Sequence, residues 1–507
     1  MAVARQSDGR VIPGKPSKSR RCGIGAAASL GALAAVGLWA GPALAAPPQI
    51  RVPTEEQLQP GETPSTVEGP DFIGGLARTN FLLGNMGGLR PFLSQYGISF
   101  ALQETSEVLG NVTGGIHKGF DYDGLTQMLL QLDTNRAFGW YGGTFNASAL
   151  QIHGRNLSAD NLGTLQTASG IEADRSTRLW EVWYDQKFLD EDRGDIRVGQ
   201  QSLDQEFIVS QNASYFVNTM FGWPMVPSAD LPGGGPAYPL SALGVRGKWR
   251  PVDPLTFLVG VFNGSPVKNG VGGDPQLANS SGASFPTNGG ALVIAEMQYS
   301  YPALGSMIYA DQSQPLARVY KLGFWYDTEH FNDLRFDNTG LSLANPATTG
   351  IPQQHRGDYS IYAVADQLVW VDPQESDRTI NLFARAMGTP EENRSLIDFS
   401  LNAGMIFHEP FLNRDDDTFG VGMGFAKVSS RAAALDQDTQ SLTGAFTPTR
   451  TNEAFVEVIY QYAVAPWLML QPDFQYVFNP GGGIANASGT ARVKDEAVLG
   501  VRTNILF

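Results

Sequence analysis

Cysteine is almost absent from this sequence, which has a single one, Cys22, among 507 residues. If the N-terminal segment that holds Cys22 is removed on export, disulfides and cysteine-ligated metal sites are excluded. Charged residues are also sparse, at 17%, whereas hydrophobic residues make up 42%. Because disorder needs high charge and low hydrophobicity, this composition excludes a mostly disordered chain. The net charge of −15 makes nucleic acid an unfavourable partner.

Long apolar runs are missing after the N-terminal segment, so the later chain has no predicted helix that could span a membrane. Residues 1–45 combine a basic stretch, an uncharged run rich in Gly and Ala, and a small-residue cleavage site ending at Ala45. We interpret them as a signal peptide; the alternative is a transmembrane anchor, which the Gly, Ala and Pro content disfavours. The exported chain is then either soluble outside the cytoplasm or a β-barrel.

Two segments precede the main domain. Residues 46–70 are rich in Pro, Glu, Gln and Thr without periodicity, which predicts a flexible leader. Residues 71–98 are predicted to form a periplasmic plug segment with one short helix, because Pro91 suits a first helical position and Gly97 a C′ position. Residues 99–507 are predicted to form the main domain.

The main domain alternates with a period of two, which is typical of half-buried strands. In residues 418–427, for example, large apolar side chains occupy one face and glycine the other. Sixteen such segments are predicted: 99–109, 125–132, 144–153, 178–186, 195–200, 245–250, 255–262, 291–300, 318–328, 357–370, 379–389, 396–407, 418–427, 453–462, 467–476 and 496–507.

The connections between these segments alternate in length. Those after odd-numbered strands are mostly long, such as 110–124, 154–177 and 201–244, and those after even-numbered strands are mostly short. This alternation is typical of outer-membrane barrels. A large soluble all-β domain is the alternative, but aromatics near strand ends and polar or glycine-rich opposite faces favour a membrane barrel with a water-filled lumen. The predicted fold is therefore an all-β, transmembrane, antiparallel barrel of sixteen strands.

Several motifs resemble the carbohydrate-selective porins of Gram-negative outer membranes, the OprB-type family. They occur in the same order along residues 81–507: LLGNMGGLRP at 82–91, GISF at 97–100, EVLGN at 107–111, SALQIHG at 148–154, RVGQ at 197–200, FGWP at 221–224, ADLP at 229–232, GGPAYPL at 234–240, KLGFWY at 321–326 and QPDFQY at 471–476. One departure is Asn85-Met86, where the family carries Asp-Trp near the periplasmic mouth.

The resemblance implies a sixteen-stranded outer-membrane barrel that takes up glucose and related sugars by passive diffusion. A general porin, or one for another small solute, is the alternative within the same fold, and a barrel enzyme or adhesin is a third class. The sequence has no G-x-S-x-G elbow, no nucleotide loop and no metal-ligand spacing among its histidines, so we predict neither catalysis nor a cofactor. His153 is expected to face the lumen near a rim.

A sugar that enters a narrow pore must exchange water for protein donors, acceptors and flat aromatic faces. The longest connection, 201–244, carries acids, aromatics and five prolines, and we expect it to fold into the lumen as a constriction loop rather than cover the mouth as a lid. Strand parity predicts that Trp180 faces lipid and that neighbouring charges face the lumen. The candidate channel-lining residues are Glu107, Glu181, Trp183, Arg197, Trp223, Asp230, Arg246 and Lys248.

The partners expected from sequence are sugars, outer-membrane lipid and the barrel-assembly machinery, and homo-oligomer formation stays open. The assembly machinery is expected to read the C-terminal strand, which has apolar residues at alternate positions before Phe507. Removal of Phe507 should therefore reduce insertion into the outer membrane more than it reduces the stability of barrels that do insert. Quantifying heat-modifiable barrel in membranes, and the thermal stability of purified barrel, would test this; equal loss of both would contradict it.

Overall fold

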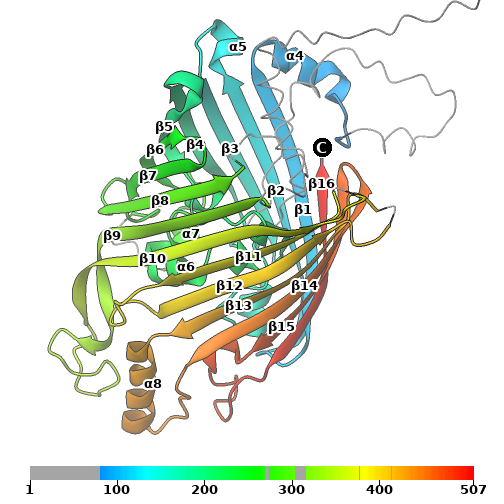
Figure 1. Ribbon diagram of the computed structural model, residues 1–507. Coiled ribbons are helices and arrows are strands. Elements are labelled where there is room, and N and C mark those ends of the chain that lie inside the picture. The colour runs from blue at the N-terminus through cyan, green and yellow to red at the C-terminus, as the bar shows by residue number, and fades with distance from the viewer. Residues whose placement is uncertain (1–79, 269–272, 303–315, 376, 413) are drawn as a thin grey trace, which may run out of the picture.

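A computed structural model describes residues 80–268, 273–302, 316–375, 377–412 and 414–507. Expectations for residues 1–45 and 46–70 lie outside this range. The described chain forms one closed barrel of sixteen antiparallel strands, in which each strand pairs with its sequence neighbours and β1 closes on β16 (Figure 1).

All sixteen predicted strands are present. Their bounds are β1 Ile98–Thr113, β2 Gly119–Asp133, β3 Gly143–Gly154, β4 Ser176–Phe188, β5 Gly194–Gln201, β6 Ala242–Val252, β7 Leu255–Asn263, β8 Ala291–Tyr301, β9 Arg318–Asp337, β10 Pro352–Val371, β11 Thr379–Gly388, β12 Ile397–His408, β13 Thr418–Val428, β14 Asn452–Ala465, β15 Leu468–Phe478 and β16 Glu496–Leu506.

The two faces of the sheet differ as the period of two predicts. On β1, the polar side chains of Gln103, Thr105 and Glu107 point inward and are buried, whereas Val108 points outward and is exposed. Further along the barrel, exposed outward side chains such as Leu322 are apolar. This arrangement places polar groups in the lumen and apolar groups toward lipid, as an outer-membrane barrel requires.

Some connections differ from the sequence prediction. The predicted long connection 110–124 is a short one, because β1 and β2 stay paired as far as Asn111 and Gly119. In contrast, β9 and β10 are longer than predicted: β9 continues to Asp337 instead of ending at residue 328, and β10 begins at Pro352 instead of residue 357. The alternation of apolar and polar residues marks only the part of a strand that faces lipid. It therefore does not predict strand pairing that continues beyond the membrane into water.

The described residues contain five α-helices: α4 Leu89–Gln95, α5 Thr134–Phe138, α6 Met225–Asp230, α7 Pro275–Ala278 and α8 Ser430–Thr443. Of these, α4 and α5 lie at one end of the barrel and α8 lies at the other, whereas α6 is part of the connection between β5 and β6 (Figure 1). The predicted N-terminal helix is α4, and Gly97 follows its C-cap with φ +72°, as expected. Pro91 is its third residue instead of its first, which is tolerated because first-turn N–H groups have no helical partner. Among the described residues, no helix is both long and apolar enough to cross a membrane.

The sequence gives no prediction of α8, which lies at the end of the barrel opposite α4 and α5 (Figure 1). Its N-cap is Ser429, and Gly444 ends it with φ +70°. Arg335, near the end of β9, holds Asp438 of α8 through two bonds of 2.7 and 2.9 Å. These hydrogen bonds lower the pKa of the Asp438 carboxyl below its ordinary value.

The N-terminal segment is tied to the end of the last strand. The Leu82 N–H donates to the Leu506 carbonyl at 2.8 Å, and the Arg90 guanidinium donates to the carbonyls of Gly84 and Phe507. The Phe507 N–H also donates to the Leu102 carbonyl of β1 at 2.9 Å. Two neighbouring elements therefore hold the backbone at Phe507.

These contacts suggest two substitutions that test the role of Phe507 more specifically than its deletion does. In Phe507→Ala the backbone bonds persist, whereas Arg90→Met removes the guanidinium and keeps the aromatic side chain. If assembly depends on recognition of the aromatic ring, Phe507→Ala should lower barrel insertion and Arg90→Met should mainly lower thermal stability. Insertion would be measured by heat-modifiable mobility in isolated membranes. The reverse pattern would show that the contact with the N-terminal segment, and not recognition of Phe507, controls insertion.

Candidate functional site

The longest loop, residues 202–241, lies inside the barrel. Its start is fixed where the Ser202 N–H donates to the Glu181 carboxylate at 2.9 Å, and its later part where Asp230 accepts from the N–H groups of Leu396 and Ile397 at 2.7 and 3.2 Å. Between these points the loop reaches inward-facing residues of strands across the lumen. It is therefore an inward-folded loop rather than a lid.

Charged lumen side chains hold the loop by its backbone. Glu457 on β14 accepts from the N–H groups of Val217 and Asn218 at 2.5 and 3.1 Å. Arg385 on β11 donates to the carbonyls of Ile208 and Gly222 at 3.0 and 2.9 Å, and also to that of Met220. Hydrogen bonds to charged groups are about twice as strong as neutral ones, so these residues fix the loop in one position.

Apolar packing completes the attachment. Phe216 and Phe221 of the loop stack with ring centroids 4.4 Å apart, and both contact Phe383 on β11. On β13 they lie above Gly422, where a Cβ atom would be 2.6 Å from the Phe221 ring. The inward glycine of β13 therefore leaves room in the lumen, and loop aromatics occupy that room.

A cluster of six charged side chains lies where the loop passes β4–β6; we call it the β4–β6 cluster. It consists of three acids and three bases: Asp185, Asp195, Arg197, Glu206, Arg246 and Lys248. Because β4, β5 and β6 are consecutive neighbours in the barrel, parity brings their inward charges together. Glu206 is supplied by the loop. The formal charges of the cluster balance.

Arg246 is at the centre of this cluster. Its guanidinium contacts Asp195, lies 3.2 Å from an Asp185 oxygen and donates to Glu206 at 2.7 Å. Arg197 donates to Asp185 at 3.0 Å, and the Lys248 ammonium lies 3.0 Å from Asp195. The network thus alternates acids and bases around a buried arginine.

Solvent reaches part of the cluster. The side chain of Arg246 is 1% exposed, whereas those of Arg197, Glu206 and Lys248 are 21%, 23% and 40% exposed. The Arg197 guanidinium also stacks over the Trp183 ring, 3.9 Å from its centroid. The accessible edge therefore offers hydrogen-bond donors and an acceptor, while Trp183 is buried beneath the Arg197 guanidinium.

Burial raises the pKa of the Glu206 carboxyl above its ordinary value, and the nearby Arg197 and Lys248 oppose that rise. In contrast to Asp438, whose pKa is lowered, Glu206 therefore takes up a proton at a less acidic pH. Its protonation removes one negative charge from the balanced cluster.

The structure brings four of the eight sequence-predicted site residues together: Trp183, Arg197, Arg246 and Lys248. The other four make different contacts. Glu107 pairs with Arg502 in a fully buried ion pair at the barrel closure. The Trp223 indole donates to the Gly234 carbonyl within the loop at 2.9 Å, and Glu181 and Asp230 bind loop or strand backbone as described above.

Two predicted side-chain orientations are wrong, that of Trp180, which follows from strand parity, and that of His153. Trp180 points into the barrel, because a β-bulge between β3 and β4 shifts the register there and adds Trp180 as an extra residue. Its ring packs edge-on against Tyr238 of the loop. His153 points outward, because its neighbour Ile152 takes the inward position opposite Leu125.

Sequence reasoning also missed residues of the cluster. Asp195 was not singled out, although its parity with Arg197 on β5 places it inward. Glu206 is one of the acids of the long loop, and nothing in the sequence indicates that it meets β6. Among the described residues, no group of three His, Cys, Asp or Glu side chains is arranged to hold a metal ion.

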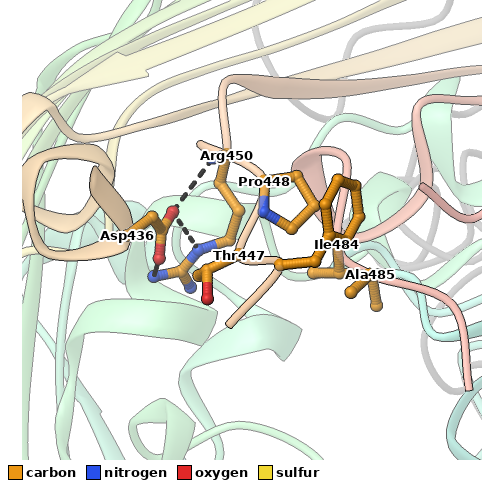
Figure 2. A pocket seen from close by; sticks show the side chains of 7 residues that line it. Asp436, Thr447, Pro448, Arg450, Ile484 and Ala485 are labelled. Carbon is orange, nitrogen blue, oxygen red and sulfur yellow. Dashed lines mark hydrogen bonds and ion pairs between the residues drawn. The ribbon is translucent and has the colours of Figure 1, made fainter. Parts of the chain in front are cut away.

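A separate hollow of about 200 Å³ lies at the α8 end of the barrel (Figure 2). In it the Asp436 carboxylate is bound by the Arg450 side chain through two bonds of 2.9 Å. None of its lining residues belongs to the β4–β6 cluster or to loop 202–241: they are Asp436, Phe446, Thr447, Pro448, Arg450, Ile484 and Ala485. This hollow is not the candidate site, because its charged groups saturate each other away from the lumen cluster.

Known proteins are similar to this chain in sequence and in structure. It is 23% identical over 451 residues to Porin B of Pseudomonas aeruginosa, which covers 85% of this chain and 92% of that protein. It is 22% identical over 454 residues to the putative porin QuiX of Acinetobacter baylyi, covering 84% and 93%. The high-pH structure of Pseudomonas putida OprB matches with a TM-score of 0.71 at 22% identity, covering 85% of this chain and 99% of that one.

The profile of the OprB family of carbohydrate-selective porins matches residues 117–507, which is most of the chain. This match agrees with the motifs found in the sequence, and with the closed barrel of a Gram-negative outer-membrane protein. The family and the fold indicate a channel rather than an enzyme. The chain therefore belongs to the carbohydrate-selective porin family, OprB.

Proposed function

We propose that this porin admits glucose and related sugars to the periplasm by passive diffusion, and that solutes contact Arg197, Glu206 and Lys248, with the buried Trp183 holding the Arg197 guanidinium in place. The observation that carries the proposal is the partly exposed edge of a charge-balanced network beside an indole ring. The inward-folded loop 202–241 supports a role as the constriction loop, because it brings Glu206 to that edge.

The chemistry of a sugar suits this edge. Hydroxyl groups both donate and accept hydrogen bonds, so a surface that offers guanidinium, ammonium and carboxylate groups together can replace lost water. Because the charges already bind one another, each solute contact stays weak, as release on the periplasmic side requires.

A general diffusion porin of the same fold is the second candidate. A balanced cluster has no net charge to attract ions of one sign, which also suits neutral solutes other than sugars. Selectivity among neutral solutes of one size separates the two candidates.

Liposome swelling with purified, refolded protein would make that comparison. Glucose should enter faster than amino acids and dipeptides of similar size, because only the sugar presents a ring of hydroxyls to the cluster. Rates for each solute would be compared with those of liposomes without protein. Entry that depends on solute size alone would contradict sugar selectivity and leave the barrel assignment intact.

Loss of an accessible cluster residue should reduce this selectivity. Arg197→Ala removes a donor and its stacking on Trp183, and should lower the ability of glucose to compete for entry by roughly tenfold, as expected for one hydrogen bond to a charged group. Arg246→Ala should also weaken competition, and it additionally leaves Asp185 and Asp195 without their buried partner. Lys427→Ala is the matched control, because it removes an exposed strand cation that pairs with Asp398 outside the cluster.

Glucose competition in swelling assays would be compared among these variants, with barrel formation checked by heat-modifiable mobility. Normal assembly with reduced competition in Arg197→Ala, but not in Lys427→Ala, would support the site. Unchanged transport in both arginine variants would rule out the β4–β6 cluster as the solute contact.

Acidification should shift ion selectivity toward anions. Because burial raises the pKa of Glu206, lowering the pH protonates this carboxyl early and leaves the cluster with a net positive charge. The zero-current potential across a planar bilayer in a KCl gradient would report the change. Glu206→Gln should show the acid-like potential already at neutral pH and lose much of the pH response. Asp438→Asn, whose carboxyl has a lowered pKa at the α8 end, should behave as the unmodified protein.

A further inference from the structure

Four polar side chains gather on the lumen face of β8, β9 and β10; we call them the β8–β10 site. Glu296 and Gln298 lie on β8, Lys321 on β9 and Asp366 on β10. Gln298 and Lys321 are register partners. Lys321 also lies opposite Val364 of β10, two residues from Asp366 on the same face. The four side chains are therefore neighbours on the inner wall, and none of them belongs to the β4–β6 cluster.

The β8–β10 site is built against the inward-folded loop. The Asp366 Oδ1 atom accepts from the Ser210 hydroxyl at 2.6 Å and from the Asn212 side-chain amide at 2.9 Å. The Glu296 Oε2 atom accepts from the Ile208 N–H at 2.8 Å. The β4–β6 cluster contacts the same stretch of loop a few residues earlier, so one segment of the loop borders both groups.

Solvent reaches the segment of the loop beside this site. Gln211 is exposed and Asn212 is half-buried. On the barrel wall, Gln298 is half-buried and the side chain of Lys321 is 8% exposed. A polar and partly accessible surface therefore borders the β8–β10 site, as it borders the β4–β6 cluster.

Two charged groups of the site have hydrogen-bonding capacity left over. Within the part of the chain that the structure describes, the Lys321 ammonium donates no hydrogen bond, and its one ion pair is a long contact of 3.8 Å with Glu296 Oε1. That oxygen already accepts from the Gln298 amide at 2.6 Å. The Asp366 Oδ2 atom is buried and has no hydrogen-bond partner among the described residues. Because a buried charged atom without a partner is costly, a further group is expected here.

The placement of these two charges indicates which chemical group suits them. Diagonal neighbours on one face of a strand pair lie about 7–8 Å apart, within reach of a long side chain. Among the described contacts, Lys321 and Asp366 nevertheless form no ion pair with each other. An ammonium only donates and a carboxylate only accepts, so a group that bridges them must accept from the first and donate to the second. A hydroxyl group does both.

We propose that the β8–β10 site is a second solute contact of the pore, in which a sugar hydroxyl accepts a hydrogen bond from Lys321 and donates one to Asp366. This inference rests on the proposed sugar function and adds specificity-determining residues away from the β4–β6 cluster. Because the bridging group must both donate and accept, the site favours neutral hydroxyl-bearing solutes over ions of either sign. The amides of Asn212 and Gln298 lie beside it and suit neighbouring hydroxyls.

Two substitutions separate this bridging role from the structural roles of the same residues. Lys321→Met keeps most of the side-chain length and removes the ammonium. Asp366→Asn keeps the Oδ1 acceptor that holds Ser210 and Asn212, and replaces the unpartnered oxygen with an amide nitrogen, which only donates. The double variant retains the net charge of the unmodified protein, so its ion conductance without sugar should be unchanged if the loop stays in place.

Purified protein in planar bilayers would be titrated with glucose, and the decrease of ion current would give the concentration of half-maximal effect. This concentration should rise several-fold in Lys321→Met and in Asp366→Asn. In the double variant the rise should be smaller than the product of the two single effects, because one hydroxyl makes both hydrogen bonds. Lys427→Met is the matched control and should behave as the unmodified protein, because its partner Asp398 lies outside the site. Asp366→Asn alone serves if Lys321→Met does not form heat-modifiable barrel.

The outcomes distinguish this inference from the proposed function. A saturable effect of glucose on the unmodified protein, unchanged in both single variants, would overturn the β8–β10 site and leave the proposed function intact. A changed ion conductance of the double variant without sugar would also overturn it, because the residues would then act by holding the loop. An effect of glucose that does not saturate in the unmodified protein would overturn both.

Discussion

Closure of β1 on β16 is the contact on which the rest of this molecule depends. In hydrocarbon, a sheet with an open edge would leave unpaired backbone groups, so only a closed ladder can cross the membrane. Where the two strands meet, Glu107 and Arg502 form an ion pair with no exposed surface. Loss of one partner of such a pair typically costs about 3–5 kcal/mol, because the other charge stays buried. Once the barrel is closed, every strand has one face toward lipid and one toward the lumen, and polar groups are confined to the second.

A barrel of this size would enclose a wide lumen if it were empty. Loop 202–241 fills much of it, together with the connection between β3 and β4, where Leu165 and Gln166 bind Glu453 of β14. The loop carries backbone polar groups into the interior, where they need partners. Lumen charges such as Arg385 and Glu457 provide them, and the stacked Phe216 and Phe221 pack above the glycine of β13. Most inward charges are therefore used for architecture. A charge bound to loop backbone has little capacity left for a passing molecule, so the solute contacts are proposed at the partly exposed charges of the β4–β6 cluster instead.

The sequence was sufficient for features that depend on alternation. All sixteen strands and the inward orientation of Arg197 and Lys248 follow from a period of two and from the cost of charge in lipid. It was insufficient where the backbone departs from that period. A single extra residue at the β3–β4 bulge turns Trp180 inward, and no local signal marks the bulge. Contacts made by long loops could not be predicted from the sequence either, because only the closed barrel brings Asp230 and Glu181 close to their partners.

Polar side chains of the strands face the lumen and apolar side chains face lipid, so a residue that departs from this rule needs an explanation. Local rules are generally kept in folded proteins, and the places where they fail tend to carry function or strain. Trp180 breaks the parity expected of its strand and gains a packed position against the loop. Glu104 obeys strand parity and still breaks the rule against charge toward lipid, so nothing in the backbone accounts for it. Its hydrogen bonds to Thr126 and Ser106 reduce that cost.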